Sequence, residues 1–66
     1  MRISINGEER ELDSPCTVGQ LLDELGLTGG ACAVEVNATL VPRSEHASRA
    51  LAAGDTVELV TLVGGG

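Results

Sequence analysis

The order of extended and helical patterns along this chain predicts an α+β fold, in which a mixed β-sheet is covered on one face by one main helix. Three observations support this prediction: an alternating N-terminal segment that leads into Asn6-Gly7, one amphipathic segment after Thr17, and a β-branched segment near the C-terminus. The chain has 66 residues, which suffices for one small domain. We therefore expect a single domain over residues 1–63 and a flexible glycine tail over residues 64–66.

The first two expected elements form a β-hairpin. Residues 2–5 alternate apolar and polar side chains and lead into Asn6-Gly7, a pair that tolerates the positive φ angles of a tight two-residue turn. Residues 8–12 are predicted to form the return strand, whose acidic side chains would oppose pairing with other sheet edges. Pro15 then ends the extended segment.

A helix is expected to begin at Thr17. Gln20 follows three residues later, which is the spacing at which the two side chains cap each other's backbone N–H groups. Gly26 suits the left-handed conformation that ends many helices. Between these two ends, four apolar residues recur at helical spacing and predict one buried stripe: Val18, Leu21, Leu22 and Leu25.

The second half of the chain predicts three further strands. Residues 32–36 alternate as a strand that we expect near the centre of the sheet, and residues 37–39 form a plausible turn into a short edge strand at residues 40–41. Residues 43–53 have a mixed pattern, which predicts a loop with one helical or 3₁₀ turn. The last strand, residues 56–63, is rich in Leu and β-branched residues.

Alternation within this last strand predicts an exposed apolar surface. Val57 and Leu59 should face the core and Glu58 the solvent, and the same period places Val60 and Leu62 on the solvent side. Large apolar side chains that are exposed together are typical of protein docking surfaces. The alternative is a bulge or a covering loop.

Composition and charge exclude several classes of function. Ten acidic residues oppose four arginines, so the net charge of −6 would repel nucleic acid and anionic membranes. The chain has no aromatic residue on which bases could stack. A core this thin is not expected to support an enzyme, and the absence of a secretory signal or an apolar span indicates a cytoplasmic protein.

The residues that most often bind metals do not predict a metal site. Cys16, Cys32 and His46 are too few and too widely spaced for a zinc or iron–sulfur centre. We expect both cysteines to be small buried or half-buried hydrophobic residues, with a disulfide or redox role as the alternative. His46 is expected to be a surface loop residue.

The chain ends in Val63-Gly64-Gly65-Gly66, and average composition does not explain three terminal glycines. Without Cβ atoms, such a segment is narrow enough to thread a tight channel and deliver its terminal carboxylate to a partner's catalytic centre. A free carboxylate is a poor electrophile, so coupling to AMP with ATP and Mg²⁺ would activate it for attack by a sulfur nucleophile. The alternative is a frayed end without function.

These segments together resemble the ThiS family, the ubiquitin-like sulfur carriers of thiamine biosynthesis. The resemblance covers nearly the whole chain. It rests most on the combination of chain length, the Val41-Pro42-Arg43-Ser44-Glu45 segment and the terminal Val63-Gly64-Gly65-Gly66, whereas many ubiquitin-like domains contain a turn similar to Gly54-Asp55-Thr56-Val57-Glu58. Family members commonly have an aromatic residue where this chain has His46 and Leu62. The resemblance implies a β-grasp, ubiquitin-like fold.

The resemblance also implies two protein partners. A ThiF-like adenylating enzyme, which uses ATP and Mg²⁺, would activate the chain, and a ThiG-like thiazole synthase would accept its sulfur. The chain itself would bind no cofactor, catalyse nothing and be a monomer when free. Gly66 would carry the adenylate and then the thiocarboxylate, with Gly64 and Gly65 as the threading arm, and the docking contacts would be Val60, Leu62 and Val63.

Other functions stay open from the residues alone. A carrier that serves molybdopterin, tRNA thiolation or another sulfur-containing metabolite would end in the same glycines. A ubiquitin-like modifier would be joined to target lysines through Gly66. A non-covalent interaction module would not need its glycines at all.

Overall fold

Five strands, one α-helix and one 3₁₀ turn make up the described part of the chain. The structure, a computed structural model, describes residues 1–27 and 32–61. The elements occur in the predicted order, and residues 62 and 63 of the last expected strand lie outside the described residues. Their bounds are β1 (Arg2–Ile5), β2 (Glu8–Glu11), α1 (Val18–Glu24), β3 (Cys32–Val36), β4 (Thr39–Val41), the 3₁₀ turn η1 (Arg43–Glu45) and β5 (Thr56–Thr61).

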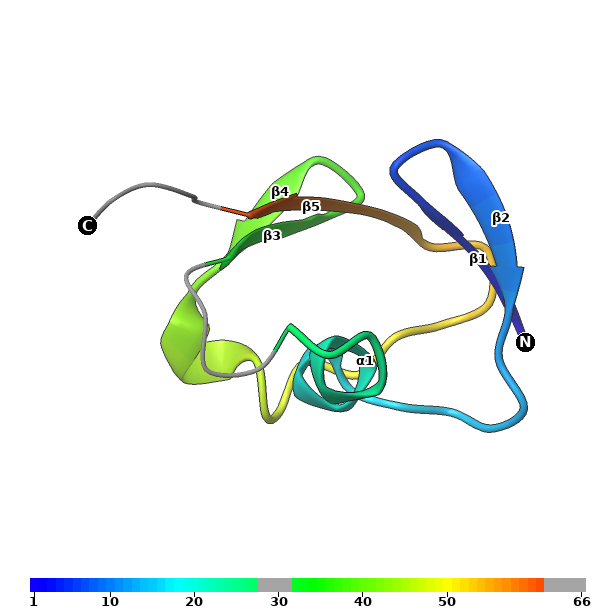
Figure 1. Ribbon diagram of the computed structural model, residues 1–66, viewed down its shortest axis with the longest axis horizontal. Helices are drawn as coiled ribbons and strands as arrows, with labels where there is room; N and C mark the ends of the chain where they lie inside the picture. Colours follow the sequence, from blue (N-terminus) through cyan, green and yellow to red (C-terminus); the bar gives the residue numbers. More distant parts are fainter. Residues whose placement is uncertain (28–31, 62–66) are drawn as a thin grey trace.

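The strands form one mixed sheet in the order β2-β1-β5-β3-β4. The central pair, β1 and β5, is parallel, whereas β1 with β2, β3 with β4 and β3 with β5 are antiparallel. Figure 1 shows α1 lying across one face of this sheet. The prediction of a mixed sheet with one covering helix is confirmed. The middle strand is β5, and β3 lies between it and the edge strand β4.

The β1–β2 hairpin closes where the sequence predicts. Asn6 has a φ of 51° and Gly7 a φ of 85°, so both central turn residues are left-handed, as a two-residue hairpin turn requires. The register places Ile5 opposite Glu8 and Arg2 opposite Glu11. The expected return strand is one residue shorter than predicted, and Leu12 follows it with its side chain in the core.

Helix α1 has the predicted start and end. The Gln20 backbone N–H donates to Thr17 Oγ1 at 3.2 Å, and the Thr17 N–H donates to Gln20 Oε1 at 2.9 Å, which completes the reciprocal cap. Gly26 follows the helix with a φ of 75°. The first three residues of the predicted apolar stripe are buried, and the fourth, Leu25, is half-buried. With seven residues, α1 is much shorter than the roughly 20 that cross a bilayer, and no described helix is long and apolar enough to do so.

The core between the helix and the sheet contains only aliphatic side chains. The sheet contributes the side chains of one face, since successive strand residues alternate between the core and the solvent, and α1 contributes its apolar stripe. Partly buried Met1, Ile5, Leu27 and both cysteines pack around this centre. The buried hydrophobic residues are Ile3, Leu12, Val18, Leu21, Leu22, Val34, Val36, Val41, Leu51 and Val57.

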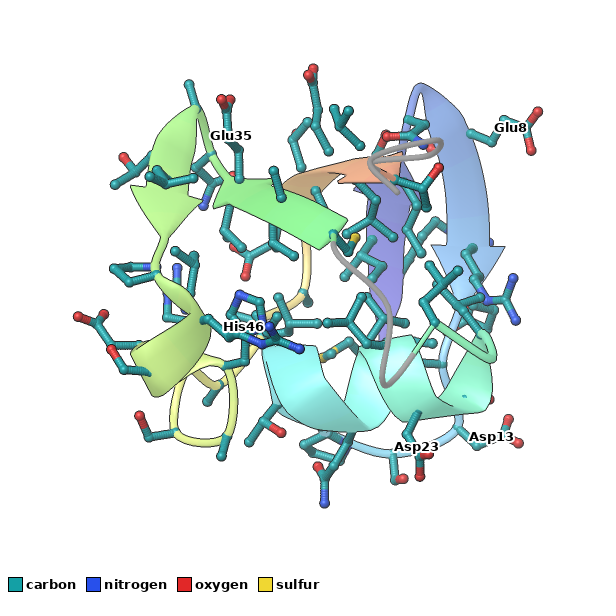
Figure 2. All side chains as sticks on the ribbon, turned by 60° about the vertical axis from the view of Figure 1, so that its left-hand side comes forward. Glu8, Asp13, Asp23, Glu35 and His46 are labelled. Atoms are coloured by element: carbon teal, nitrogen blue, oxygen red, sulfur yellow. The ribbon has the colours of Figure 1, made fainter. Side chains whose placement is uncertain are left out.

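His46 differs from its prediction as a surface loop residue. It directly follows η1 and is half-buried, and its Nε2 donates to the Val41 carbonyl oxygen at 3.0 Å. Figure 2 shows His46 on the inner side of the sheet, whereas the labelled acidic residues point outward. The cause is a close approach of the backbone to α1, because the Gly19 N–H donates to the His46 carbonyl oxygen at 2.8 Å. A Cβ on Gly19 would lie only 3.3 Å from that oxygen.

Candidate functional site

The described part of the candidate site is the second half of β5. The alternation continues without a bulge, because Leu59 lies opposite Val34 and Val60 lies opposite Ala33 in one antiparallel register. Leu59 is half-buried against the core, and Val60 is 57% exposed. The predicted exposure of Val60 is therefore confirmed. Leu62, its expected companion, lies outside the described residues.

Asn6 attaches this half of β5 to the hairpin. The backbone pairing of β1 with β5 ends at Ile5 and Val57, where β1 turns away. The Asn6 side chain then takes the place of the next backbone pair. Its Oδ1 accepts from the Leu59 N–H at 2.8 Å, and its Nδ2 donates to the Leu59 carbonyl oxygen at 3.2 Å. The carboxamide thus fixes the β5 backbone two residues before Thr61.

A second asparagine holds the other end of β5. Asn37 Oδ1 accepts from the Thr56 N–H at 2.9 Å, and Asn37 Nδ2 donates to Asp55 Oδ1 at 3.0 Å. Asp55 is buried, and its Oδ2 accepts from the Ala52 N–H at 2.8 Å. Both asparagines come from turns between neighbouring strands. They tie the start of β5 at Thr56 and its second half at Leu59 to the turns of the sheet.

Neither asparagine contact can be predicted from the sequence. Asn6-Gly7 is fully explained as a turn, since Asn and Gly are the residues that this turn conformation favours. The contact between Asn6 and Leu59 joins residues 53 positions apart in the chain. No local pattern in the sequence marks such a pair.

The sheet face that points away from α1 carries two exposed large apolar side chains. Within the described residues, only Leu40 and Val60 are large hydrophobic residues with more than half of their surface exposed, at 62% and 57%. Leu40 lies opposite Glu35 across β3 and β4, and Glu35 lies opposite Glu58 across β3 and β5. We call these four residues the outer-face surface: Glu35, Leu40, Glu58 and Val60. Of the four, only Val60 is a docking contact that the sequence predicts.

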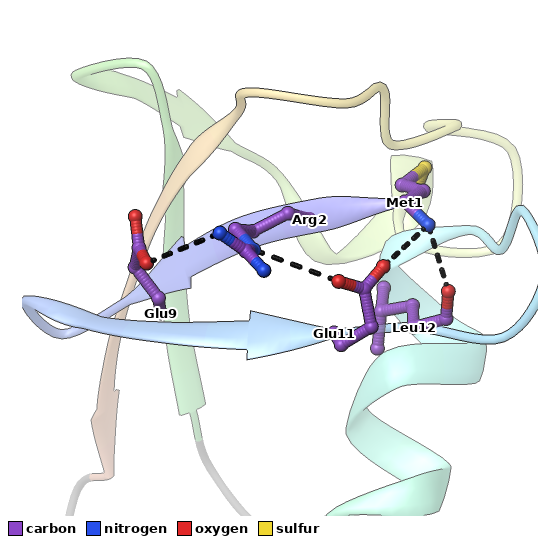
Figure 3. A network of polar contacts seen from close by, with 5 residues as sticks. All are labelled: Met1, Arg2, Glu9, Glu11 and Leu12. Carbon is purple, nitrogen blue, oxygen red and sulfur yellow. Dashed lines mark hydrogen bonds and ion pairs between the residues drawn. The ribbon is translucent and has the colours of Figure 1, made fainter.

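The hairpin edge carries a separate set of charges, and these have partners within the hairpin. Figure 3 shows Arg2 between Glu9 and Glu11, with contacts of 3.7 and 3.5 Å, and the Met1 amino group 2.9 Å from Glu11 Oε2. The Met1 amino group, and secondarily Arg2, lowers the pKa of the Glu11 carboxyl below its ordinary value. A lowered pKa in the folded state means that this stabilisation is complete above the ordinary pKa and is lost as pH falls through the lowered one.

The described residues supply no reactive side chain to the site. Cys16 and Cys32 are free and half-buried, which confirms their prediction as partly buried hydrophobic residues. Burial, and secondarily the charge of Glu24, raises the pKa of the Cys16 thiol, so this sulfur is less nucleophilic at neutral pH than an exposed thiol. In residues 1–27 and 32–61, no three His, Cys, Asp or Glu side chains gather as a metal site would require.

The remaining predicted site residues follow β5 and lie outside the described part of the chain: Leu62, Val63, Gly64, Gly65 and Gly66. Their roles stay predictions. Covalent geometry nevertheless limits how far Gly66 can lie from β5. Gly66 is five residues after Thr61. A fully extended chain advances at most about 3.6 Å per residue, so the two Cα atoms lie within roughly 18 Å of each other.

The sheet is mixed, with β1 and β5 parallel and the strands on both sides of this pair antiparallel, and one helix covers a single face. This arrangement defines a β-grasp, ubiquitin-like protein. Of the outer-face surface, Val60 is the residue nearest the described end of β5, and the row of Leu40, Glu35 and Glu58 lies nearer the β3–β4 turn. The chain belongs to the ThiS family, whose family model matches residues 3–66. The fold and family implied by the sequence are therefore confirmed.

Individual relatives agree with this assignment. The crystal structure of the thiamine biosynthesis protein ThiS from Geobacter metallireducens superposes with a TM-score of 0.85, at 28% identity, over 100% of both chains. The thiazole synthase of Paramagnetospirillum magneticum is 46% identical over 66 residues, which is 100% of this chain and 20% of that protein. The uncharacterized protein ycf40 of Porphyra purpurea is 38% identical over 64 residues, covering 97% of this chain and 90% of that one. This chain thus spans about a fifth of the thiazole synthase that it matches.

Proposed function

We propose that this chain is a sulfur carrier for the thiazole ring of thiamine, with the sulfur held as a thiocarboxylate on Gly66. The observation that carries the proposal is the family match, because it continues through the three glycines to residue 66. The anchored β5, which leads into that segment, supports it. The chain would act as a co-substrate of other enzymes and would catalyse no step itself.

The chemistry required of Gly66 has two steps. Its carboxylate attacks the α-phosphorus of ATP and releases pyrophosphate, which turns a poor electrophile into a mixed anhydride with AMP as leaving group. Sulfide, supplied as HS⁻ by the sulfur donor, then displaces AMP, forms the C–S bond and loses its proton to leave a thiocarboxylate. ATP and Mg²⁺ would be bound by a ThiF-like adenylating enzyme. The contribution of this chain is to present the carboxyl group.

The glycines explain how that group would reach an enclosed catalytic centre. Gly64 and Gly65 would form the threading arm, because a segment without side chains fits the narrowest channel. Ordering it costs about 1–2 kcal/mol per residue in backbone entropy, which contacts of the folded domain must offset. Val60, Leu62 and Val63 are the proposed contacts. Since the arm reaches at most roughly 18 Å beyond Thr61, the partner must bind the domain close to β5.

The similarity to thiazole synthases supports the proposed destination of the sulfur. Proteins of that name contain a segment that matches the whole of this chain. A carrier segment within the same polypeptide as the synthase would keep the two close together. We therefore propose a separate ThiG-like thiazole synthase as the acceptor for this chain, and delivery to another sulfur pathway is the outcome that would replace it.

Intact-protein mass spectrometry tests this function directly. The chain is incubated with ATP, Mg²⁺, a ThiF-like adenylating enzyme and a sulfur donor. We expect the mass to rise by the difference between one sulfur and one oxygen atom, and the product to support thiazole formation by a ThiG-like synthase. A matched variant with a C-terminal carboxamide has the same residues but no carboxylate, and should not react.

Three other results would contradict the proposal. Larger conjugates to target lysines would indicate a protein modifier. A thiocarboxylate that the synthase does not accept would indicate another sulfur pathway. An unchanged mass of the wild-type chain would show that the glycines carry no chemistry.

A further inference from the structure

We propose that the outer-face surface is a docking site for a protein partner that places a basic side chain between Glu35 and Glu58 and apolar groups against Leu40 and Val60. The inference rests on the proposed function, in which the first such partner is the adenylating enzyme. It goes further because it assigns binding to two carboxylates and to a leucine on β4.

The sheet register brings these residues together. Leu40, Glu35 and Glu58 form one row across β4, β3 and β5, and Val60 lies one step along β5 on the same face. Directly opposed residues of antiparallel strands have Cβ atoms about 5 Å apart. Figure 2 shows Glu35 pointing away from α1. The surface thus presents two neighbouring carboxylates, with Leu40 beside Glu35 across the strands and Val60 next to Glu58 along β5.

The two carboxylates lack partners in the structure. Among the described residues, neither Glu35 nor Glu58 has an ion pair or a hydrogen bond to its side chain, whereas Arg2 is engaged by Glu9 and Glu11. Like charges directly opposite each other destabilise a sheet. A cation that binds between them would remove this repulsion. The free protein therefore has a strained charge arrangement that complex formation would relieve.

The apolar neighbours suit the same kind of partner. Arginine combines a planar cation with a hydrophobic stem and is enriched at the energetic centres of protein interfaces. Leu40 and Val60 would cover that stem and exclude water from the ion pairs. Because Val60 precedes Thr61 by one residue, a partner bound here also lies within reach of the C-terminal arm.

Charge excludes the other plausible occupants. A second copy of this chain would bring the same two carboxylates to the interface. Nucleic acid and anionic lipid are negatively charged, and the chain itself has a net charge of −6. A basic protein surface is the class of partner that all four side chains fit.

The test compares two double variants in the adenylation reaction. Glu35→Gln/Glu58→Gln neutralises the proposed pair without changing its shape. Glu8→Gln/Glu24→Gln removes the same number of charges from β2 and α1, at two exposed positions outside the outer face. The KM for the carrier and the kcat are measured with a ThiF-like adenylating enzyme at low and high salt, and the Tm is measured by calorimetry.

We expect Glu35→Gln/Glu58→Gln to raise the KM about tenfold and to weaken its salt dependence, with kcat within about twofold of the wild type. Its Tm should equal or exceed that of the wild type, because the repulsion is gone. The control, Glu8→Gln/Glu24→Gln, should change neither KM nor kcat by more than about twofold. A role in holding the sheet together would instead lower the Tm.

Two results would overturn the inference. If both double variants have the same KM, total charge and not this surface steers binding. If the Tm of Glu35→Gln/Glu58→Gln falls while its KM rises, the two glutamates stabilise the fold and do not bind the partner. Absence of reaction with the wild-type chain would overturn the proposed function and this inference together. A normal wild-type reaction, with an unchanged KM for Glu35→Gln/Glu58→Gln, would overturn the docking site alone.

Discussion

Ala38 adopts a backbone conformation that alanine rarely occupies. It has a φ of 67° and follows Asn37 at 53°, so both central residues of the β3–β4 turn are left-handed. Left-handed conformations cost a residue with a Cβ of the order of 1–3 kcal/mol, and glycine avoids this strain but has more entropy to lose on folding. The turn contains the Asn37 side chain that holds the start of β5. The strained turn is therefore also the turn that anchors β5, the strand that leads to the site.

Ala38→Gly should raise the free energy of unfolding by about 0.5–1 kcal/mol, because relief of strain outweighs the added entropy cost. Urea denaturation followed by far-ultraviolet circular dichroism measures it, since a chain without aromatic residues has no fluorescence signal. Ala53→Gly is the matched control. Ala53 is an exposed turn residue without a positive φ, so its replacement by glycine should lower the free energy of unfolding by a few tenths of a kcal/mol. A loss of stability in Ala38→Gly would contradict the strain.

Asn6 combines two roles that substitutions can separate. Asn6→Gly keeps the left-handed turn but removes both bonds to Leu59. We expect it to lower the free energy of unfolding by about 1–3 kcal/mol, at about 0.5–1.5 kcal/mol for each of the two hydrogen bonds. Amide hydrogen exchange at Leu59 should accelerate more than exchange at Val36, in the neighbouring strand. Equal protection of Leu59 in variant and wild type would mean that the side chain does not hold β5.

At the scale of elements, the reciprocal cap determines where α1 begins. A seven-residue helix is too short to be stable alone, so it depends on its cap and on its packing against the sheet. Thr17→Ala removes the oxygen that accepts from Gln20 and should cost about 1 kcal/mol, within the usual range of 0.5–2. Thr17→Ser keeps that oxygen and should stay close to the wild type. Chemical denaturation of the three proteins measures the difference, and equal losses in both variants would show that the Thr17 methyl group, and not its oxygen, matters.

The elements that sequence reasoning predicted well depend on short-range chemistry. The hairpin turn follows from Asn6-Gly7, and the helix start follows from Thr17 and Gln20, because the interacting groups are at most three residues apart. Exposure of Val60 followed from the strand period alone. Each of these patterns is complete within one segment of the chain.

The features that the sequence did not reveal depend on long-range pairing. The sequence predicts only that Leu40 belongs to a short edge strand, whereas its exposure and its place opposite Glu35 follow from the β3–β4 register. The pairing of Glu35 with Glu58 joins strands that are far apart in the chain. His46 is half-buried because Gly19 lets its backbone approach α1. Such contacts need the assembled sheet.

Over the whole molecule, two groups of acidic side chains lie in contrasting environments. Along the hairpin edge, Glu9 and Glu11 are matched by Arg2 and the Met1 amino group, so this edge is locally balanced. On the outer face, Glu35 and Glu58 oppose each other across neighbouring strands. A surface charge that stabilises nothing in the free domain is available for binding. This contrast places the interaction surface on the outer face and not on the hairpin.

The whole fold depends on a small aliphatic core with little stability in reserve. At about 0.05–0.15 kcal/mol per residue, a chain of this length has an unfolding free energy of only roughly 3–10 kcal/mol. Leu21 is fully buried between the helix and the sheet, and Leu21→Ala should cost about 2–5 kcal/mol through lost contacts and a cavity. We therefore expect Leu21→Ala to be largely unfolded at 37 °C. Leu40→Ala, at a position that is 62% exposed, should change stability by less than about 0.5 kcal/mol.

Thermal unfolding followed by far-ultraviolet circular dichroism separates these two leucine variants. A cooperative transition of Leu21→Ala near that of the wild type would mean that the sheet and helix pack more adaptably than the fully buried Leu21 indicates. A large drop for Leu40→Ala would mean that this side chain supports the fold. With the expected result, Leu40→Ala remains folded, so any loss in its binding to the adenylating enzyme reports on docking and not on the state of the domain.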